Sequence, residues 1–274
     1  MAFSLDKFVP ENVVTAFLIA SIRKAQVFAG LVRVHDGVAV KPGESFRVPG
    51  VGSITVGTYA GTTDISVQAL SDTGVDISID QLKYYAFYLD KVDDEQAAQS
   101  VLGAYVNQAT YALSDTADTY LASTMQAGAG VAVTGGAVTK SNVIDWIGSM
   151  KQGLDESNCP SVDRWLVVTP AIASALAIAN VVTSTTTSEE ARSTGFVQRA
   201  MDFDVYMSNN LPVAASGTHA CIAGVPSSTD YLNQIQSVEF TDAEKRFASI
   251  SKGLHVYGAA VTQSGYLAYS NIND

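Results

Sequence analysis

Two Ser-x-x-Lys pairs, Ser21 with Lys24 and Ser249 with Lys252, are the residues whose types and spacing best fit catalytic chemistry. On a helix, a lysine one turn after a serine can take the serine's proton and make its hydroxyl a nucleophile. The Ser-Asp-Asn and Lys-Thr-Gly elements that accompany such a pair in serine–lysine hydrolases are absent from the sequence. We therefore expect both pairs at solvated helix ends, and a serine hydrolase using Ser249 and Lys252 remains as an alternative.

The acidic and glycine-rich stretches do not predict a cofactor or metal site. Asp72, Asp76 and Asp80 would point the same way from a strand at intervals of about 13 Å, too far apart to share one calcium ion. Residues 128–135 (GAGVAVTG) follow a predicted helix, whereas a dinucleotide-binding loop follows a strand and opens a helix. The three histidines lack a carboxylate or cysteine at ligand spacing. We expect no catalytic residue, no cofactor and no metal.

The two cysteines, Cys159 and Cys221, are far apart and show no Cys-x-x-Cys spacing, so we expect buried free thiols.

Composition excludes a second class of function. The chain of 274 residues has 16 basic and 27 acidic residues, a net charge of -11, and lacks a run of Lys and Arg. Sequence-specific DNA binding would need such a phosphate-neutralising stripe. The apolar run Val13–Ile22 is about half the roughly 20 residues of a membrane span, so no membrane contact is expected.

The first third of the chain predicts an arm and a long hairpin. Apolar residues at helical spacing predict a short helix from Glu11 to about Leu31. The next stretch is rich in Gly, Val, Ile, Thr and Tyr with turn signals, and predicts hairpin arms at Val38–Thr58 and Thr63–Ile79, then a strand through Tyr84–Tyr88. Such a hairpin has too little core of its own and must lie on something else.

From Asp90 the period changes to that of a helix. A stripe of apolar residues predicts one helix over Val92–Met125, about 50 Å long at 1.5 Å per residue. The glycines at 127–130 and 135–136 predict a flexible connection after it.

The remaining chain predicts α/β alternation. The expected elements are a helix at 141–154, a strand at 165–169, a helix at 170–180, strands at 201–207 and 219–223, a short helix at 227–236 and alternating strand pattern over 246–269. Asn209 and Asn210 before Pro212 raise the question of a ligand site, but this composition is typical of a turn that ends the strand.

This order of elements resembles the major capsid protein of tailed bacteriophages, the Hong Kong 97-type fold. Five short stretches resemble phrases of such coats: KFVPENVV (7–14), QALSDTGVDISIDQ (68–81), RWLVVTP (164–170), DFDVYMSNNLP (202–212) and KGLHVYGA (252–259). Together they extend over nearly the whole chain in the right order.

The resemblance implies an α+β fold of four parts. These are an N-terminal arm at 1–37, an E-loop hairpin at 38–82, a peripheral domain with a long spine helix at 83–130 and 239–274, and an α/β axial domain at 131–238. It also implies a coat protein that self-assembles, as pentamers and hexamers, into the icosahedral shell of a double-stranded DNA phage. An encapsulin-like nanocompartment with the same fold is the alternative.

The resemblance further implies partners and contact residues. The expected partners are copies of the same chain, a separate scaffolding protein, a portal, a possible decoration protein and packaged DNA bound without sequence preference. The expected location is the virion capsid, assembled in the host cytoplasm. Four E-loop residues are expected to contact a neighbouring subunit: Phe46, Arg47, Ile54 and Tyr59.

Some coats of this type form an isopeptide bond between an E-loop lysine and an asparagine of another subunit. Lys41 is the only lysine between Gly37 and Leu82, and it lies near the expected base of the hairpin. Because no lysine lies near the expected tip, we predict a non-covalent shell.

Overall fold

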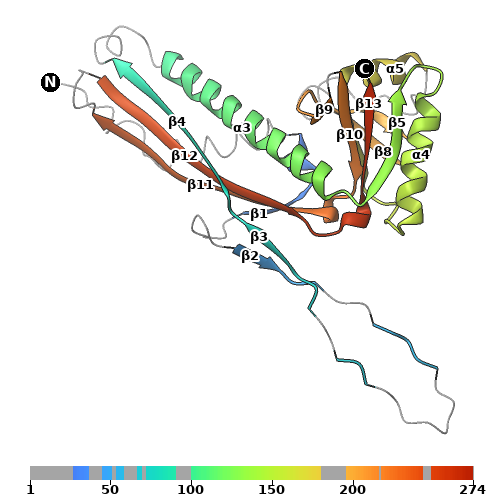
Figure 1. Cartoon of the computed structure of the whole chain (residues 1–274). Helices are drawn as coiled ribbons and strands as arrows, with labels where there is room; N and C mark the ends of the chain where they lie inside the picture. Colours follow the sequence, from blue (N-terminus) through green and yellow to red (C-terminus); the bar gives the residue numbers. More distant parts are fainter. Residues whose placement is uncertain are drawn as a thin grey trace.

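The computed structural model describes residues 27–36, 45–50, 54–58, 67–69, 72–90, 100–179, 196–215, 217–242 and 248–273. The fold is mixed α and β, with one long helix lying along a long sheet and a compact seven-stranded sheet with its helices at the other end (Figure 1). A two-stranded hairpin projects from the long sheet.

The long sheet has four strands in the order β1-β11-β12-β4. Their bounds are β1 Arg33–Asp36, β11 Thr229–Asp242, β12 Ala248–Val261 and β4 Gln81–Asp90. Strand β1 is parallel to β11, and the other pairs are antiparallel. The strand expected through Tyr84–Tyr88 is confirmed.

The short helix expected at 227–236 is wrong. Only the 3₁₀ turn η3 (Pro226–Ser228) precedes strand β11. The pairing of β11 with β12 shifts register between Ile235 and Ser237, which is a bulge. The bulge lies at the end of the predicted helix; within that helix range, the neighbouring Tyr231 and Leu232 are both buried, so both faces of β11 are covered there and its apolar residues do not alternate with period two.

Helix α3 (Ser100–Gly128) confirms the expected long helix and ends three residues later than expected, and residues 91–99 lie outside the described part. Leu113, Ala117, Leu121 and Met125 recur every four residues and are buried. The helix contacts strand β12 of the long sheet and strands β10 and β13 of the compact sheet. It therefore ties the two parts of the molecule together.

The compact sheet has the order β5-β13-β10-β6-β8-β7, with β9 pairing with β10. Its strands are β5 Val131–Ala137, β6 Arg164–Val168, β7 Phe196–Ala200, β8 Phe203–Met207, β9 Val213–Ala215, β10 Thr218–Gly224 and β13 Leu267–Asn273. The expected strands at 165–169, 201–207 and 219–223 correspond to β6, β8 and β10. Strand β7 was not anticipated.

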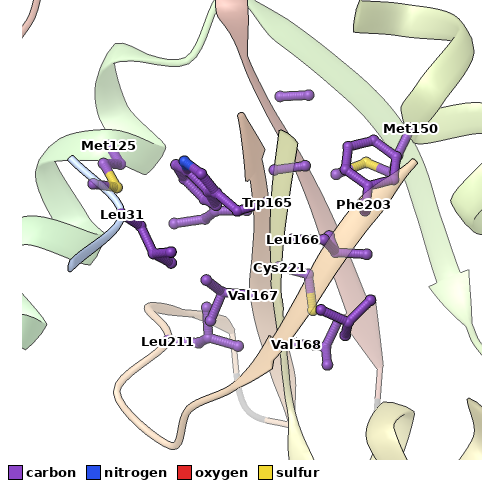
Figure 2. Close-up of a cluster of buried hydrophobic side chains, with 14 of the residues drawn as sticks. Leu31, Met125, Met150, Trp165, Leu166, Val167, Val168, Phe203, Leu211 and Cys221 are labelled. Atoms are coloured by element: carbon purple, nitrogen blue, oxygen red, sulfur yellow. The ribbon is translucent and has the colours of Figure 1, made fainter. Parts of the chain in front are cut away.

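Two helices belong to the compact part, α4 (Val143–Glu156) and α5 (Pro170–Ile178), close to their expected bounds. Proline occupies the first turn of α5, and the Thr169 side chain accepts a hydrogen bond from the Ile172 amide. Figure 2 shows that the side chains of β6 alternate between two layers. Trp165 points toward Met125 of α3, and Leu166 points toward Met150 of α4 and Phe203.

The glycines at 135–136 do not form a flexible connection, so that expectation is wrong. Both lie in strand β5, which pairs in parallel with β13. A Cβ added at Gly135 would lie 1.5 Å from the Asn271 carbonyl oxygen. Glycine is needed here because the two backbones approach closely.

The expected long hairpin is confirmed at its base, where β2 (Ser45–Val48) pairs antiparallel with β3 (Val75–Ser78). Ile77 and Ile79 pack with Leu232 and Val256 of the long sheet in a second, small core. Segments 54–58 and 67–69 lie beyond the hairpin, away from the rest of the molecule (Figure 1).

The predicted N-terminal helix falls mostly outside the described residues. Its last part is the 3₁₀ turn η2 (Phe28–Gly30), not an α-helix.

Candidate subunit-interaction surfaces

The residues that first suggested catalysis are not arranged for it. Positions 249 and 252 both lie on strand β12, so they are not one helical turn apart as the serine–lysine chemistry would require. The expected helix ends are therefore wrong for this pair. The Ser21 and Lys24 pair lies outside the described residues. Among the described residues, no group of three or more His, Cys, Asp and Glu side chains is placed to hold a metal ion.

Two histidines have structural partners in the long sheet. His35 Nε2 lies 2.8 Å from Oδ1 of the fully buried Asp230, and His255 Nε2 lies 2.6 Å from Asn233 Oδ1. Burial lowers the pKa of His255 to about 4, so this imidazole is neutral at physiological pH. Cys159 and Cys221 are buried free thiols, as expected.

The question raised by Asn209 and Asn210 is answered by a turn that also makes a tertiary contact. Strand β8 ends at Met207, and the Asn210 amide donates to Ser208 Oγ at 3.1 Å. The Asn210 side-chain Nδ2 donates to Asp115 Oδ1 at 2.8 Å and to Asp118 Oδ2 at 3.3 Å, both on α3. The sequence predicted the turn but gave no signal for this contact with the helix.

Asp118 joins three segments of the chain. Its Oδ1 accepts the Phe28 amide at 2.9 Å, while its Oδ2 faces Asn210. Burial raises the pKa of Asp118 to about 6, and the nearby Asp115 carboxylate raises it further, against the hydrogen bonds that lower it. A buried carboxylate thus connects the start of the described chain, helix α3 and the turn after β8.

The segments beyond the hairpin expose apolar side chains. Val56 is 92% exposed, Val67 is 90% exposed, and Ile54 is also exposed. The Thr55 amide donates to Gln68 Oε1 at 2.9 Å, so the two segments are held beside each other. We call segments 54–58 and 67–69 the projection. Several exposed apolar side chains gathered on one such part of a molecule are typical of a binding surface.

The four expected contact residues differ in their surroundings. Ile54 is exposed on the projection, as a contact residue would be. Phe46 packs against the small core of its own chain, with its ring 5.4 Å from that of His35. The Arg47 guanidinium binds Asp72 and Asp76 of the same hairpin. Tyr59 lies outside the described residues.

A second apolar surface lies on strand β4. Leu82, Tyr84 and Tyr88 alternate with less exposed residues, and Tyr84 is 78% exposed. Because alternate residues share one face of a strand, these three side chains form a stripe on the outer face of the long sheet. We call it the β4 stripe. In Figure 1, β4 leads away from the hairpin in the opposite direction to segments 54–58 and 67–69.

Within the described part of the chain, no helix combines the length and the apolar composition needed to cross a bilayer.

Comparison with known proteins gives the family. A family model described as phage capsid protein matches residues 50–269. A solved chain from Mycobacterium phage Che8 is 32% identical, with a TM-score of 0.73, over 89% of this chain and 90% of that chain. No curated protein sequence matches.

More distant structures share the fold alone. The capsid of cyanophage P-SCSP1u is 19% identical, with a TM-score of 0.72, over 92% of this chain and 89% of that chain. A virus-like particle from Pyrococcus furiosus is 12% identical, with a TM-score of 0.59, over 93% and 96%. The family match covers most of the chain, and the Che8 relative agrees with it over nearly the full length. The chain therefore belongs to the phage capsid protein family, and it is a structural protein, a major capsid protein that forms a shell.

Proposed function

We propose that this capsid protein builds an icosahedral shell of pentamers and hexamers around a double-stranded DNA genome, with the parts of a Hong Kong 97-type subunit. The hairpin and the segments beyond it are the E-loop, and α3 is the spine helix. For the peripheral domain we replace the expected 83–130 and 239–274 by 83–130 and 229–261, because the whole of β11 pairs with β12, which pairs with β4. For the axial domain we replace the expected 131–238 by 131–224 and 267–273, because β13 pairs with β10. The N-terminal arm at 1–37 is retained.

One observation carries the proposed contact between copies: the same chain has an exposed apolar projection and an exposed aromatic stripe that lead in opposite directions. Val56 and Val67 are exposed on their own chain, and so are Leu82 and Tyr84 of the β4 stripe. We therefore assign the E-loop of one copy to the β4 stripe of the next. Such a contact joins two different patches, so it is heterologous, the type of contact that forms rings such as pentamers and hexamers when the rotation between copies closes.

The acidic composition supports a shell that encloses DNA without binding it strongly. Counterions can neutralise the phosphates, and strong attraction to the wall would hinder movement of the packed genome. A separate scaffolding protein, a portal and a decoration protein belong to this proposal, as does assembly in the host cytoplasm. The family and the Che8 relative favour a phage shell over an encapsulin-like compartment.

The test introduces a charge into the projection. Val56→Asp should raise the critical concentration for assembly by about tenfold, the effect of losing roughly 1.4 kcal/mol at each contact. Its melting temperature as a subunit should not change, because the Val56 side chain is almost fully exposed. Shell formation is measured by light scattering and electron microscopy.

Val162→Asp is the matched control. Val162 is also exposed, at 68%, but it lies between α4 and β6 in the compact part. It should assemble like the parent. Cysteines placed at Val56 of one copy and Tyr84 of the next should cross-link in shells, because the proposed contact brings them together. The two native cysteines are buried and should not compete. Normal assembly of Val56→Asp would rule out this contact.

A further inference from the structure

We propose that Arg47 and Asp72 form a clamp that fixes the direction in which the loop between Gly50 and Asp72 leaves the hairpin, and so sets where this loop meets a neighbouring copy. This inference rests on the proposed contact between E-loop and neighbour. It makes Arg47 a positioning residue within its own subunit and not a contact residue.

The guanidinium of Arg47 donates to two carboxylates of its own hairpin. Its Nη2 and Nε donate to Asp72 Oδ2 at 2.9 and 3.1 Å, a forked arrangement. Its Nη1 donates to the two oxygens of Asp76 at 3.2 and 3.3 Å. A guanidinium bound in this way to two carboxylates has no free pair of parallel N–H groups with which to bind a carboxylate of another subunit.

The carboxylate of Asp72 ties the two sides of the hairpin together. Its Oδ1 accepts the Gly74 amide at 2.8 Å on its own side and the Gly50 amide at 3.3 Å on the opposite side. Its Oδ2 accepts from Arg47 on strand β2. The clamp thus lies where the loop begins and ends.

Two glycines give an independent sign that the backbones are held close at this place. A Cβ at Gly50 would lie 2.8 Å from the Thr73 carbonyl oxygen, and a Cβ at Gly74 would lie 2.7 Å from the Val48 carbonyl oxygen. The Thr73 amide also donates to the Gly50 carbonyl at 3.4 Å. Residues with side chains would push the two sides apart and release the amides from Asp72.

Each group of the clamp favours the charged form of the other. The Gly74 amide and then Arg47 lower the pKa of Asp72, and Asp72 raises the pKa of Arg47. All three side chains are about half exposed, so the ion pairs add little to the stability of the subunit. Their effect on direction is larger. The eight Cα-to-Cα steps from Gly50 to Thr58 can span at most about 27 Å, so a tilt of about 10° at the clamp moves the far end by up to about 5 Å.

The test measures direction and assembly separately. Spin labels at Val56→Cys and Val162→Cys report the distance from the projection to the compact part in dissociated subunits. Arg47→Met should broaden this distance distribution at least about twofold and raise the critical concentration for assembly at least about fivefold, because the loop is no longer preorganised. The melting temperature should not change.

Two further variants sharpen the test. Arg47→Lys keeps the positive charge but lacks the paired N–H groups of a guanidinium. It should therefore broaden the distance distribution almost as much as Arg47→Met does. Arg199→Met removes an exposed ion pair with Asp204 at 3.6 Å in the compact part and should change neither quantity.

The outcomes distinguish this proposal from the proposed function. An unchanged distance distribution in Arg47→Met overturns the clamp, whatever the shells do. A broadened distribution with unchanged assembly also overturns it, because direction would then not control the contact. Failure of Val56→Asp to impair assembly overturns the E-loop contact itself, independently of the distances.

Discussion

At the scale of single residues, Asp118 is a carboxyl whose charged form is disfavoured by burial. Its pKa is raised from 3.8 to about 6, chiefly by burial. A carboxyl whose pKa is higher in the folded state binds its proton more tightly there, so its contribution to stability is present below about pH 4 and is lost as the pH rises through about 6.

We therefore predict that the difference in free energy of unfolding between the parent and Asp118→Asn depends on pH. The parent should lose on the order of 2 to 3 kcal/mol relative to the variant between pH 4 and 7. Urea unfolding of dissociated subunits at several pH values measures this difference. A constant difference over that range would show that the Asp118 carboxyl titrates normally.

Residue roles were only partly predictable from the sequence. Ile54 was predicted to contact a neighbouring subunit, and that stays a prediction; its side chain is exposed, as a contact residue of a free subunit would be. Arg47 was predicted to contact a neighbour, yet it binds Asp72 of its own hairpin, a pairing that depends on the register of β2 and β3. Likewise, only the folded chain brings Asn210 to Asp118.

At the scale of elements, the stretches with strong local signals were predicted well. The five residues of β6 are all buried, and Pro170 opens α5 directly after them. The elements that were missed depend on distant partners. Strand β7 joins β8 through Met201 and Asp202, whose φ angles of 46° and 71° normally favour Gly or Asn, so the sequence carries no hairpin signal there.

Strand β5 gives a test of the close approach that its glycine allows. Gly135→Ala places a Cβ 1.5 Å from the Asn271 carbonyl oxygen, so β5 must shift away from β13, and we expect a loss of about 2 to 4 kcal/mol in the free energy of unfolding. Gly148→Ala in α4 meets nothing within 4 Å and should stabilise the helix by about 0.5 to 1 kcal/mol. Denaturant unfolding measures both changes. Equal effects of the two substitutions would contradict this role for Gly135.

At the scale of the whole molecule, the subunit is incomplete by itself. Its projection exposes Val56 and Val67, and its long sheet exposes Tyr84 and Tyr88. The sequence predicted that the hairpin must lie on something else, because it has too little core of its own. It did not predict the β4 stripe, because alternation along a strand marks two faces but does not say whether the chain itself covers both.

We predict that the proposed shell is not covalently cross-linked, because the loop region contains a single lysine. An isopeptide bond requires a lysine amine that reaches an asparagine of another copy, with its proton removed in an apolar site. Lys41 is the only lysine between Gly37 and Leu82, and in the sequence it precedes strand β2, four residues before the paired base of the hairpin begins at Ser45. We therefore expect mature particles boiled in SDS to give one coat band at the monomer mass of 28.8 kDa. A ladder of multimers that disappears in Lys41→Ala would show instead that this lysine reaches a neighbour and that the shell is cross-linked.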